Sequence, residues 1–178
     1  MQHRAANKLA MIMLMTGLNI GLWLFGNGPA LSQEDVRKHP SCPYCGMDRG
    51  KFAHSRMLIE YEDGSTAGTC SLHCAAIELA LNIDKTPRTI RVGDYNNKVL
   101  IDAEKAFWVI GGSKMGVMTK RAKWAFEKRE EAEKFIKESG GTFRSFDEAI
   151  KAAYEDMYQD TRMIRERRKL KRMEKKYN

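Results

Sequence analysis

Four cysteines in two close pairs constrain this chain more than any other feature of its sequence. Two residues separate Cys42 from Cys45, twenty-four residues follow, and three residues separate Cys70 from Cys74. Between the pairs, residues 53–69 have the alternation and the central turn of a β-hairpin. A hairpin returns the chain to the place where it began, so this spacing predicts that the four thiols converge.

Three kinds of site would use two cysteine pairs at this spacing. Four thiolates would form a closed, tetrahedral zinc site of a structural kind. Two disulfides would suit a chain that is exported to an oxidising compartment. A redox-active pair is the weakest alternative, because Cys42 and Cys45 follow Pro40 in an expected loop without a thioredoxin-like context.

Methionines near the cysteines favour copper(I) over zinc. Met47 lies two positions after Cys45, and Met115 and Met118 occupy a glycine-flanked loop at residues 112–118. Thioether sulfur is a soft ligand that selects Cu(I) and contributes little to zinc sites. Thiols and thioethers together therefore indicate a soft-metal protein, with Cu(I) as its metal and zinc as the alternative.

The order of the expected elements predicts an α+β fold made of two similar halves. Each half contains two strands, a helix and a further strand, and a terminal helix follows the second half. The expected strands cover residues 53–61, 65–69 and 89–92, then 106–110, 123–127 and 142–144, and the expected helices cover 69–81, 130–139 and the segment from 147. We accordingly divide the chain into 1–32, a signal or anchor, 33–95, the first ββαβ unit, 96–146, the second unit, and 147–178, a C-terminal helix and tail.

The helix that carries the second cysteine pair predicts where those side chains point. If this helix begins at Thr69, Cys70 and Cys74 share one face, and the free amides of the first turn favour the thiolate form of Cys70. His73 would then point away from this face, and we expect it at the protein surface.

The N-terminal segment predicts export. His3, Arg4 and Lys8 precede an apolar run at residues 9–26. Such a run fits a cleaved signal peptide, and it is also long enough for a retained membrane anchor. Both alternatives place the chain from Gln33 onward outside the cytoplasm.

Positive charge is concentrated at the C-terminus. The chain has 31 Lys and Arg against 23 Asp and Glu, a net charge of +8. Residues 162–178 contain nine of the cations and two of the acidic residues, so the remainder of the chain carries only +1. This distribution removes the support for nucleic-acid binding by the body. We expect the tail to be a solvated helix, with contact to anionic lipid or to an acidic partner as the alternative.

Several short motifs follow one another in order along the chain. Residues 42–47 are Cys-Pro-Tyr-Cys-Gly-Met and residues 69–71 are Thr-Cys-Ser. Further on come Ala-Phe-Trp-Val-Ile-Gly-Gly-Ser at 106–113, Gly-Val-Met at 116–118 and paired glycines at 140–141. In these motifs the chain resembles the nitrous oxide reductase accessory protein family, NosL, over about residues 42–150.

The resemblance implies two ββαβ units, the fold shared with organomercurial lyase. It also implies a periplasmic Cu(I) carrier without enzymatic activity, which hands copper to a receiving protein or assembly complex during maturation of nitrous oxide reductase. Cys45, Met47 and Met118 match the family's motif positions, and Cys42 and Cys70 match recurrent cysteines. Because a thiolate with one or two thioethers leaves Cu(I) open to a partner's sulfur, the first three residues form the expected transfer site.

The chain also departs from the family pattern. No cysteine for a lipid anchor follows the apolar run, and neither Cys74 nor the basic tail is a general family feature. Cys42, Cys70 and Cys74 remain available for a structural metal, a disulfide or a second site. The rival functions are a zinc-binding or disulfide-stapled interaction module and an enzyme of the organomercurial-lyase type. The enzyme is the weaker rival, since its acidic residue would be Asp48, which lies in a glycine-flanked turn.

Overall fold

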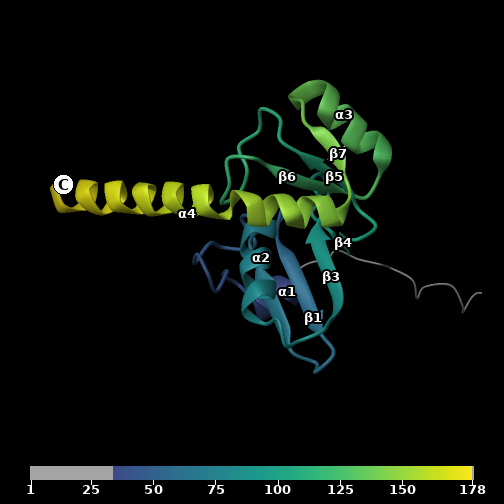
Figure 1. Cartoon of the computed structure of the whole chain (residues 1–178), viewed down its shortest axis with the longest axis horizontal. Coiled ribbons are helices and arrows are strands. Elements are labelled where there is room, and N and C mark those ends of the chain that lie inside the picture. Colours follow the sequence, from purple (N-terminus) through teal and green to yellow (C-terminus); the bar gives the residue numbers. More distant parts are fainter. Residues whose placement is uncertain (1–33, 178) are drawn as a thin grey trace, which may run out of the picture.

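The computed structural model describes residues 34–177 of the chain. Two small sheets lie one above the other in Figure 1, and the long helix α4 crosses between them. The first half comprises α1 (Glu34–Lys38), β1 (Met57–Tyr61), β2 (Thr66–Thr69), α2 (Leu72–Leu81), β3 (Pro87–Gly93) and β4 (Leu100–Asp102). The second half comprises β5 (Phe107–Ile110), β6 (Lys123–Phe126), α3 (Arg129–Ser139) and β7 (Thr142–Arg144), and α4 (Phe146–Tyr177) follows.

The two antiparallel sheets share one arrangement. The strand order is β2-β1-β3-β4 in the first sheet and β6-β5-β7 in the second. Ile59 of β1 pairs with Ala67 of β2 and with Ile90 of β3, and β5 pairs in the same way with β6 and β7. The predicted α+β fold, with strand, strand, helix and strand in each half, is confirmed.

The main hydrophobic core joins the first sheet, the helices α2 and α4, and the second sheet through Trp108, Ile110 and Ala125. Met57, Ile59 and Tyr61 alternate along β1 and are all buried on one face, as their spacing predicts. On α4, Ala149 and Ala153 belong to the same core cluster as the alanines of α2. Small side chains at this contact allow the two helices to pack closely, which brings α4 from the second half onto the first.

Two elements of the first half, α1 and β4, were not expected from the sequence. The short helix α1 is held by the buried carboxylate of Asp35, which lies 2.7 Å from Nη2 of Arg49 and 2.9 Å from Nε of Arg56. Both guanidinium groups are also buried. Arg49 further donates to the backbone oxygens of His39 and Thr69. This ion cluster therefore joins α1, the first cysteine loop and the end of β2.

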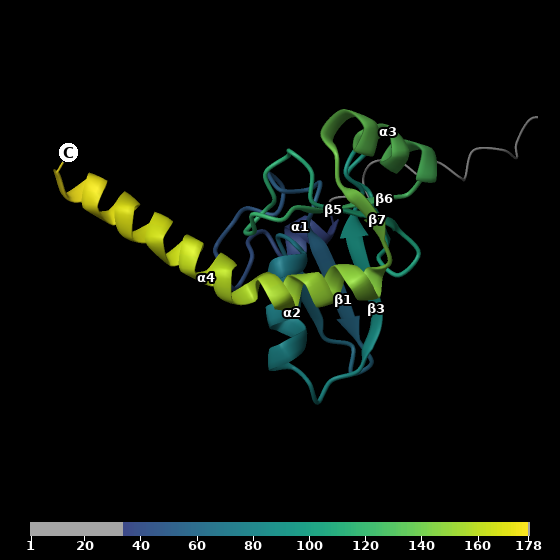
Figure 2. The ribbon, with the colours of Figure 1, turned by 45° about the horizontal axis from the view of Figure 1, so that its top comes forward.

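The outer half of α4 leaves the body and extends into solvent (Figure 2). All side chains from residue 165 to 176 are exposed. None of the helices within residues 34–177 combines the length and apolar character that a membrane crossing requires. The predicted signal or anchor at residues 1–32 lies outside the described residues.

Candidate metal centre

The four cysteine sulfurs converge at the boundary between the two halves. The Sγ atoms of Cys42, Cys45, Cys70 and Cys74 all lie within 4.8 Å of one another, as the spacing of the two pairs predicts. Cys45 and Cys70 are 3.4 Å apart, and Cys70 and Cys74 are 3.8 Å apart. All four thiols are free. The cluster is buried except at Cys45, which is half-buried.

The first pair is presented by a tight loop. The backbone N–H of Cys42 donates to the oxygen of Met47 over 2.9 Å, and the N–H of Gly46 donates to the oxygen of Cys42 over 2.8 Å. Gly46 has a φ of 76°, a conformation that glycine adopts without strain. The loop closes on itself in this way and turns the Cys42 and Cys45 sulfurs toward the same point.

The second pair lies at the start of α2. This helix begins at Leu72 with Ser71 at its N-cap, so Cys70 precedes the helix and only Cys74 lies in its first turn. His73 is buried, and its Nδ1 is 3.4 Å from a carboxylate oxygen of Asp160. The expectation of a surface histidine is therefore wrong, because α4 packs over this side of α2 and places Asp160 there.

Hydrogen bonds among the four clustered thiols shift the pKa values of these groups. The thiols of Cys45, Cys70 and Cys74 surround the sulfur of Cys42 and lower the pKa of Cys42 well below its usual range. Hydrogen bonding to Cys42 raises the pKa of Cys70 and of Cys74 far above theirs. Cys70 also lies before the N-cap of α2, so the expectation that amides of the first turn stabilise its thiolate is wrong. A metal bound by these sulfurs would displace their protons.

Hydrogen bonds from two tyrosines to one glutamate connect the first cysteine loop, residues 42–47, to α2. Tyr44, between the first two cysteines, donates a hydrogen bond to the buried carboxylate of Glu78 on α2. The hydroxyl of Tyr61 donates to the other oxygen of Glu78 over 3.0 Å. Burial and the neighbouring Glu78 raise the pKa of both tyrosines, which stay protonated as donors. The loop is thus fastened to the helix that carries Cys74.

A cavity of about 430 Å³ opens onto the thiol cluster and contains the methionines predicted as ligands. Cys45, Met47 and Met118 all line it, together with Met115 and with Met163 from α4. Met118 has a φ of 63°, which is strained for a residue with a side chain. The cavity brings the predicted transfer residues together, and Cys45 belongs to both the cavity and the four-thiol cluster.

Two cavity residues, Met163 and His54, were not expected from the sequence. Met163 belongs to the segment that the sequence predicts as a solvated helix. It reaches the cavity because α4 packs alongside it. The ring centroids of His54 and Trp124 are 5.5 Å apart. Burial lowers the pKa of His54, which favours the neutral imidazole, the form that can bind a metal through a ring nitrogen. A single histidine nine residues after Cys45 gives no spacing signal that could have identified it.

Asp48 occupies a structural position. Its carboxylate accepts a hydrogen bond from the N–H of Lys51 over 3.0 Å, and it lies in an isolated bridge with Ser41. The residue thus stabilises the turn after the cysteine loop. The carboxylate is engaged in the way expected of a turn residue.

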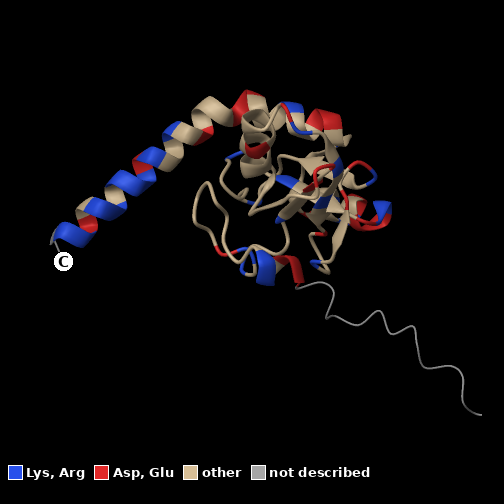
Figure 3. Ribbon diagram, turned by 90° about the horizontal axis from the view of Figure 1, so that it is seen from below, with Lys and Arg blue, Asp and Glu red and all other residues tan. Residues whose placement is uncertain are grey.

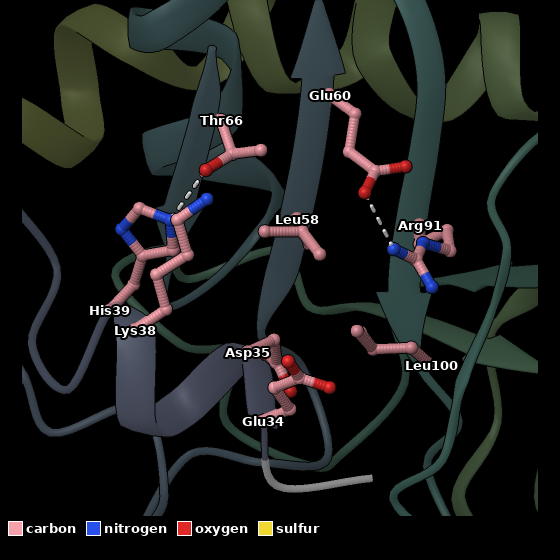
Figure 4. Close-up of a pocket in the computed structure, with 9 residues that line it drawn as sticks. All are labelled: Glu34, Asp35, Lys38, His39, Leu58, Glu60, Thr66, Arg91 and Leu100. Atoms are coloured by element: carbon pink, nitrogen blue, oxygen red, sulfur yellow. Dashed lines mark hydrogen bonds and ion pairs between the residues drawn. The ribbon is translucent and has the colours of Figure 1, made fainter. Parts of the chain in front are cut away.

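A second cavity, of about 390 Å³, lies on the face of the first sheet that is turned away from α2 and α4 (Figure 4). Most of its lining residues are charged or polar, and two hydrogen bonds cross it, one between His39 and Thr66 and one from Arg91 to Glu60. No cysteine or methionine lines it. Of these two cavities, the first alone is lined by sulfur-containing side chains.

The fold and the site together define a class: an α+β protein of two ββαβ units with a cluster of thiols between them. The NosL family model matches residues 33–154. Because this match covers more than half of the chain, the protein belongs to the NosL family. Its matched segment ends within α4, before the exposed outer half of that helix.

Among solved structures, the chain is similar to the copper chaperone NosL from Shewanella denitrificans. The two are 24% identical with a TM-score of 0.49, and the similarity covers 61% of this chain and 87% of that one. The search among curated proteins found no match.

Proposed function

We propose that this protein is a Cu(I)-binding metallochaperone without enzymatic activity, and that Cys45, Met47 and Met118 form its transfer site. The observation that carries the proposal is the double position of Cys45. Its thiol belongs to the four-thiol cluster, and it also lines the methionine-containing cavity. Soft sulfur ligands of these two kinds select Cu(I).

The arrangement supports transfer by ligand exchange. Cu(I) held by Cys45 and one or two thioethers keeps room for an incoming sulfur, so copper passes to a partner without being released as a free ion. The buried sulfurs of Cys42, Cys70 and Cys74 are the alternative ligands on the inner side of Cys45. Copper bound there would be withheld from solvent and would move outward through Cys45.

Family membership supports a receiving partner in copper-enzyme maturation. We propose that the chain acts in the periplasm and that its copper is destined for nitrous oxide reductase or its assembly complex. The N-terminal apolar run supports export, either as a cleaved signal or as an anchor.

A structural zinc site is the second candidate, and the spacing of the sulfurs favours it. Zinc–sulfur bonds of about 2.3 Å in a tetrahedron separate sulfurs by about 3.8 Å. Cys70 and Cys74 are 3.8 Å apart and Cys45 and Cys70 are 3.4 Å apart, so a small adjustment would complete such a site. Zinc, however, would make no use of the methionines in the cavity.

Substitution of the two methionines separates copper from zinc. We expect Met47→Leu and Met118→Leu each to weaken Cu(I) binding by about tenfold or more, because loss of a ligand should cost at least as much as the loss of an outer-shell contact. The measurement is an anaerobic titration of the reduced protein with Cu(I) against a chromophoric chelator.

Met57→Leu provides the matched control, since Met57 is fully buried in the main core and does not line the cavity. Its Cu(I) affinity should equal that of the unaltered chain. If all three variants bind Cu(I) equally well and zinc copurifies in stoichiometric amounts, the copper proposal is wrong.

We also expect the apparent Cu(I) affinity to rise with pH between about pH 6 and pH 8, because metal binding displaces thiol protons. Cu(I) binds the thiolate form of Cys45, so a proton held by this sulfur, or shared with the thiols clustered around it, has to leave on binding. The same chelator competition at several pH values measures the slope. Met118→Leu should keep that slope, because a thioether carries no proton, and a pH-independent affinity would contradict proton displacement.

A further inference from the structure

The outer half of α4 carries an exposed concentration of positive charge beside the methionine-lined cavity. Figure 3 shows Lys and Arg along most of this segment, with few acidic residues between them. Arg162 and Glu166 form an ion pair of 3.7 Å at its base. Further out, cations follow one another at helical spacing, as with Arg165 and Lys169, and such like-charged neighbours destabilise an isolated helix. The segment is therefore a surface that an anionic partner would stabilise.

One row of these cations borders the cavity. Arg167, Arg168 and Lys171 line it together with Cys45. Nη2 of Arg168 donates a hydrogen bond to the backbone oxygen of Cys45 over 3.1 Å. This contact shows that the face of α4 that carries Arg168 is turned toward the first cysteine loop. Lys175 lies one turn beyond Lys171 on the same face, since residues four apart are neighbours on a helix. This mouth row, Arg167, Arg168, Lys171 and Lys175, stands where a copper-receiving protein has to approach.

A second row points away from the cavity. Arg165, Lys169, Arg172 and Lys176 repeat at intervals of four, three and four residues and so share one face. Arg167, Arg168 and Lys169 are successive residues, each turned by about 100° from the last, so the cations are not confined to one side. This far row has the same charge as the mouth row but no contact with the cavity.

The distribution of side chains favours an acidic protein over a lipid surface. A helix that lies in a membrane interface needs a broad apolar face opposite its cations. In residues 165–176 the exposed large apolar side chains are Leu170 and Met173 alone. Charges on several sides suit a solvated helix in contact with a charged protein.

We propose that the mouth row of α4 is a docking surface for an acidic segment of the copper-receiving protein. The acidic residues of that segment would lie next to its own thiol or thioether, so that docking places this sulfur at Cys45 and Met118. This inference rests on the proposed chaperone function and adds to it the chemical character of the partner's surface.

The test compares two variants of equal charge in the full, reduced and metal-free chain. The mouth variant carries Arg167→Gln, Lys171→Gln and Lys175→Gln, and the far variant carries Arg165→Gln, Lys169→Gln and Arg172→Gln. The probe is a fluorescent synthetic peptide in which glutamates flank a central methionine, and its binding is followed by anisotropy. A peptide with glutamine in place of each glutamate shows the contribution of charge.

We expect the mouth variant to bind the acidic peptide about tenfold more weakly, and the far variant to lose less than about twofold, because three contacting charges are lost only in the first. Equal losses in both variants would overturn the proposal and leave a non-specific cationic helix. Displacement of the peptide by phosphatidylglycerol vesicles, but not by phosphatidylcholine vesicles, would also overturn it and make α4 a lipid-binding helix. Because no copper is present, failure of the chaperone proposal would leave these results unchanged.

Discussion

Replacing Asp35 by alanine is expected to lower the free energy of unfolding by about 3–5 kcal/mol, the usual cost of removing one partner from a buried ion pair. The change leaves the guanidinium groups of Arg49 and Arg56 buried without their shared carboxylate. Urea denaturation at neutral pH, followed by tryptophan fluorescence, measures the loss. Glu34→Ala is the matched control, because Glu34 precedes Asp35 on α1 and is exposed.

The stability contributed by Asp35 should also depend on pH in a defined direction. Burial tends to raise the pKa of Asp35, but the hydrogen bonds and charges of Arg56 and Arg49 outweigh it and lower that pKa below its ordinary value. The contribution is therefore complete at neutral pH and is lost as the pH falls below about 4 toward the folded pKa. The stability difference between the unaltered chain and Asp35→Asn should shrink over this acid range. A difference that stays constant there would contradict a charged Asp35 in the fold.

Replacing Cys45 by serine is expected to weaken Cu(I) binding more than any other single cysteine substitution, by over about 100-fold, since outer-shell changes alone cost roughly 10–100-fold. Cys45 is the one cysteine that both touches the cluster and lines the cavity. Its removal therefore deprives the inner and the outer sulfurs of their common ligand. Chelator competition under anaerobic conditions measures the effect.

Cys74→Ser is the informative comparison, because Cys74 is fully buried on the inner side of the cluster. We expect it to cost no more than about tenfold, as for a ligand that the transfer site does not use. If Cys74→Ser weakens Cu(I) binding as much as Cys45→Ser, the metal is held by all four thiols and the transfer site at the methionines is refuted.

The repeat and the convergence of thiols were predictable because both rest on local patterns. Alternation along β1 determines which face is buried, and the hairpin that follows returns Cys70 to the first cysteine pair. The Gly-flanked methionine loop could be predicted as a candidate site because Met118 has no periodic neighbours that would explain it as core, and the structure places Met118 in the same cavity as Cys45. The strained backbone of Met118, with a φ of 63°, fits such a special position.

The features that were missed depend on contacts between distant segments. Asp35, Arg49 and Arg56 look like ordinary surface charges in a sequence, and only the fold buries them together. His73 lies in the first turn of α2, on the side that α4 covers. The sequence around His73 does not predict that Asp160, from a distant segment, lies beside it. His54 and Met163 reach the cavity from separate elements, so their proximity to Cys45 arises from tertiary packing.

The continuity of α4 gives the molecule a mechanical property. Alanines of the inner half pack into the main core, and Met163, at the cavity wall, is the last buried residue of α4 before the exposed segment 165–176. From there to Tyr177 the helix is an arm of about 20 Å. A sideways force at the tip of this arm would bend α4 about the region where it enters the body, which is close to the buried Asp160. A partner that pulls on the arm would therefore apply torque beside the methionine-lined cavity.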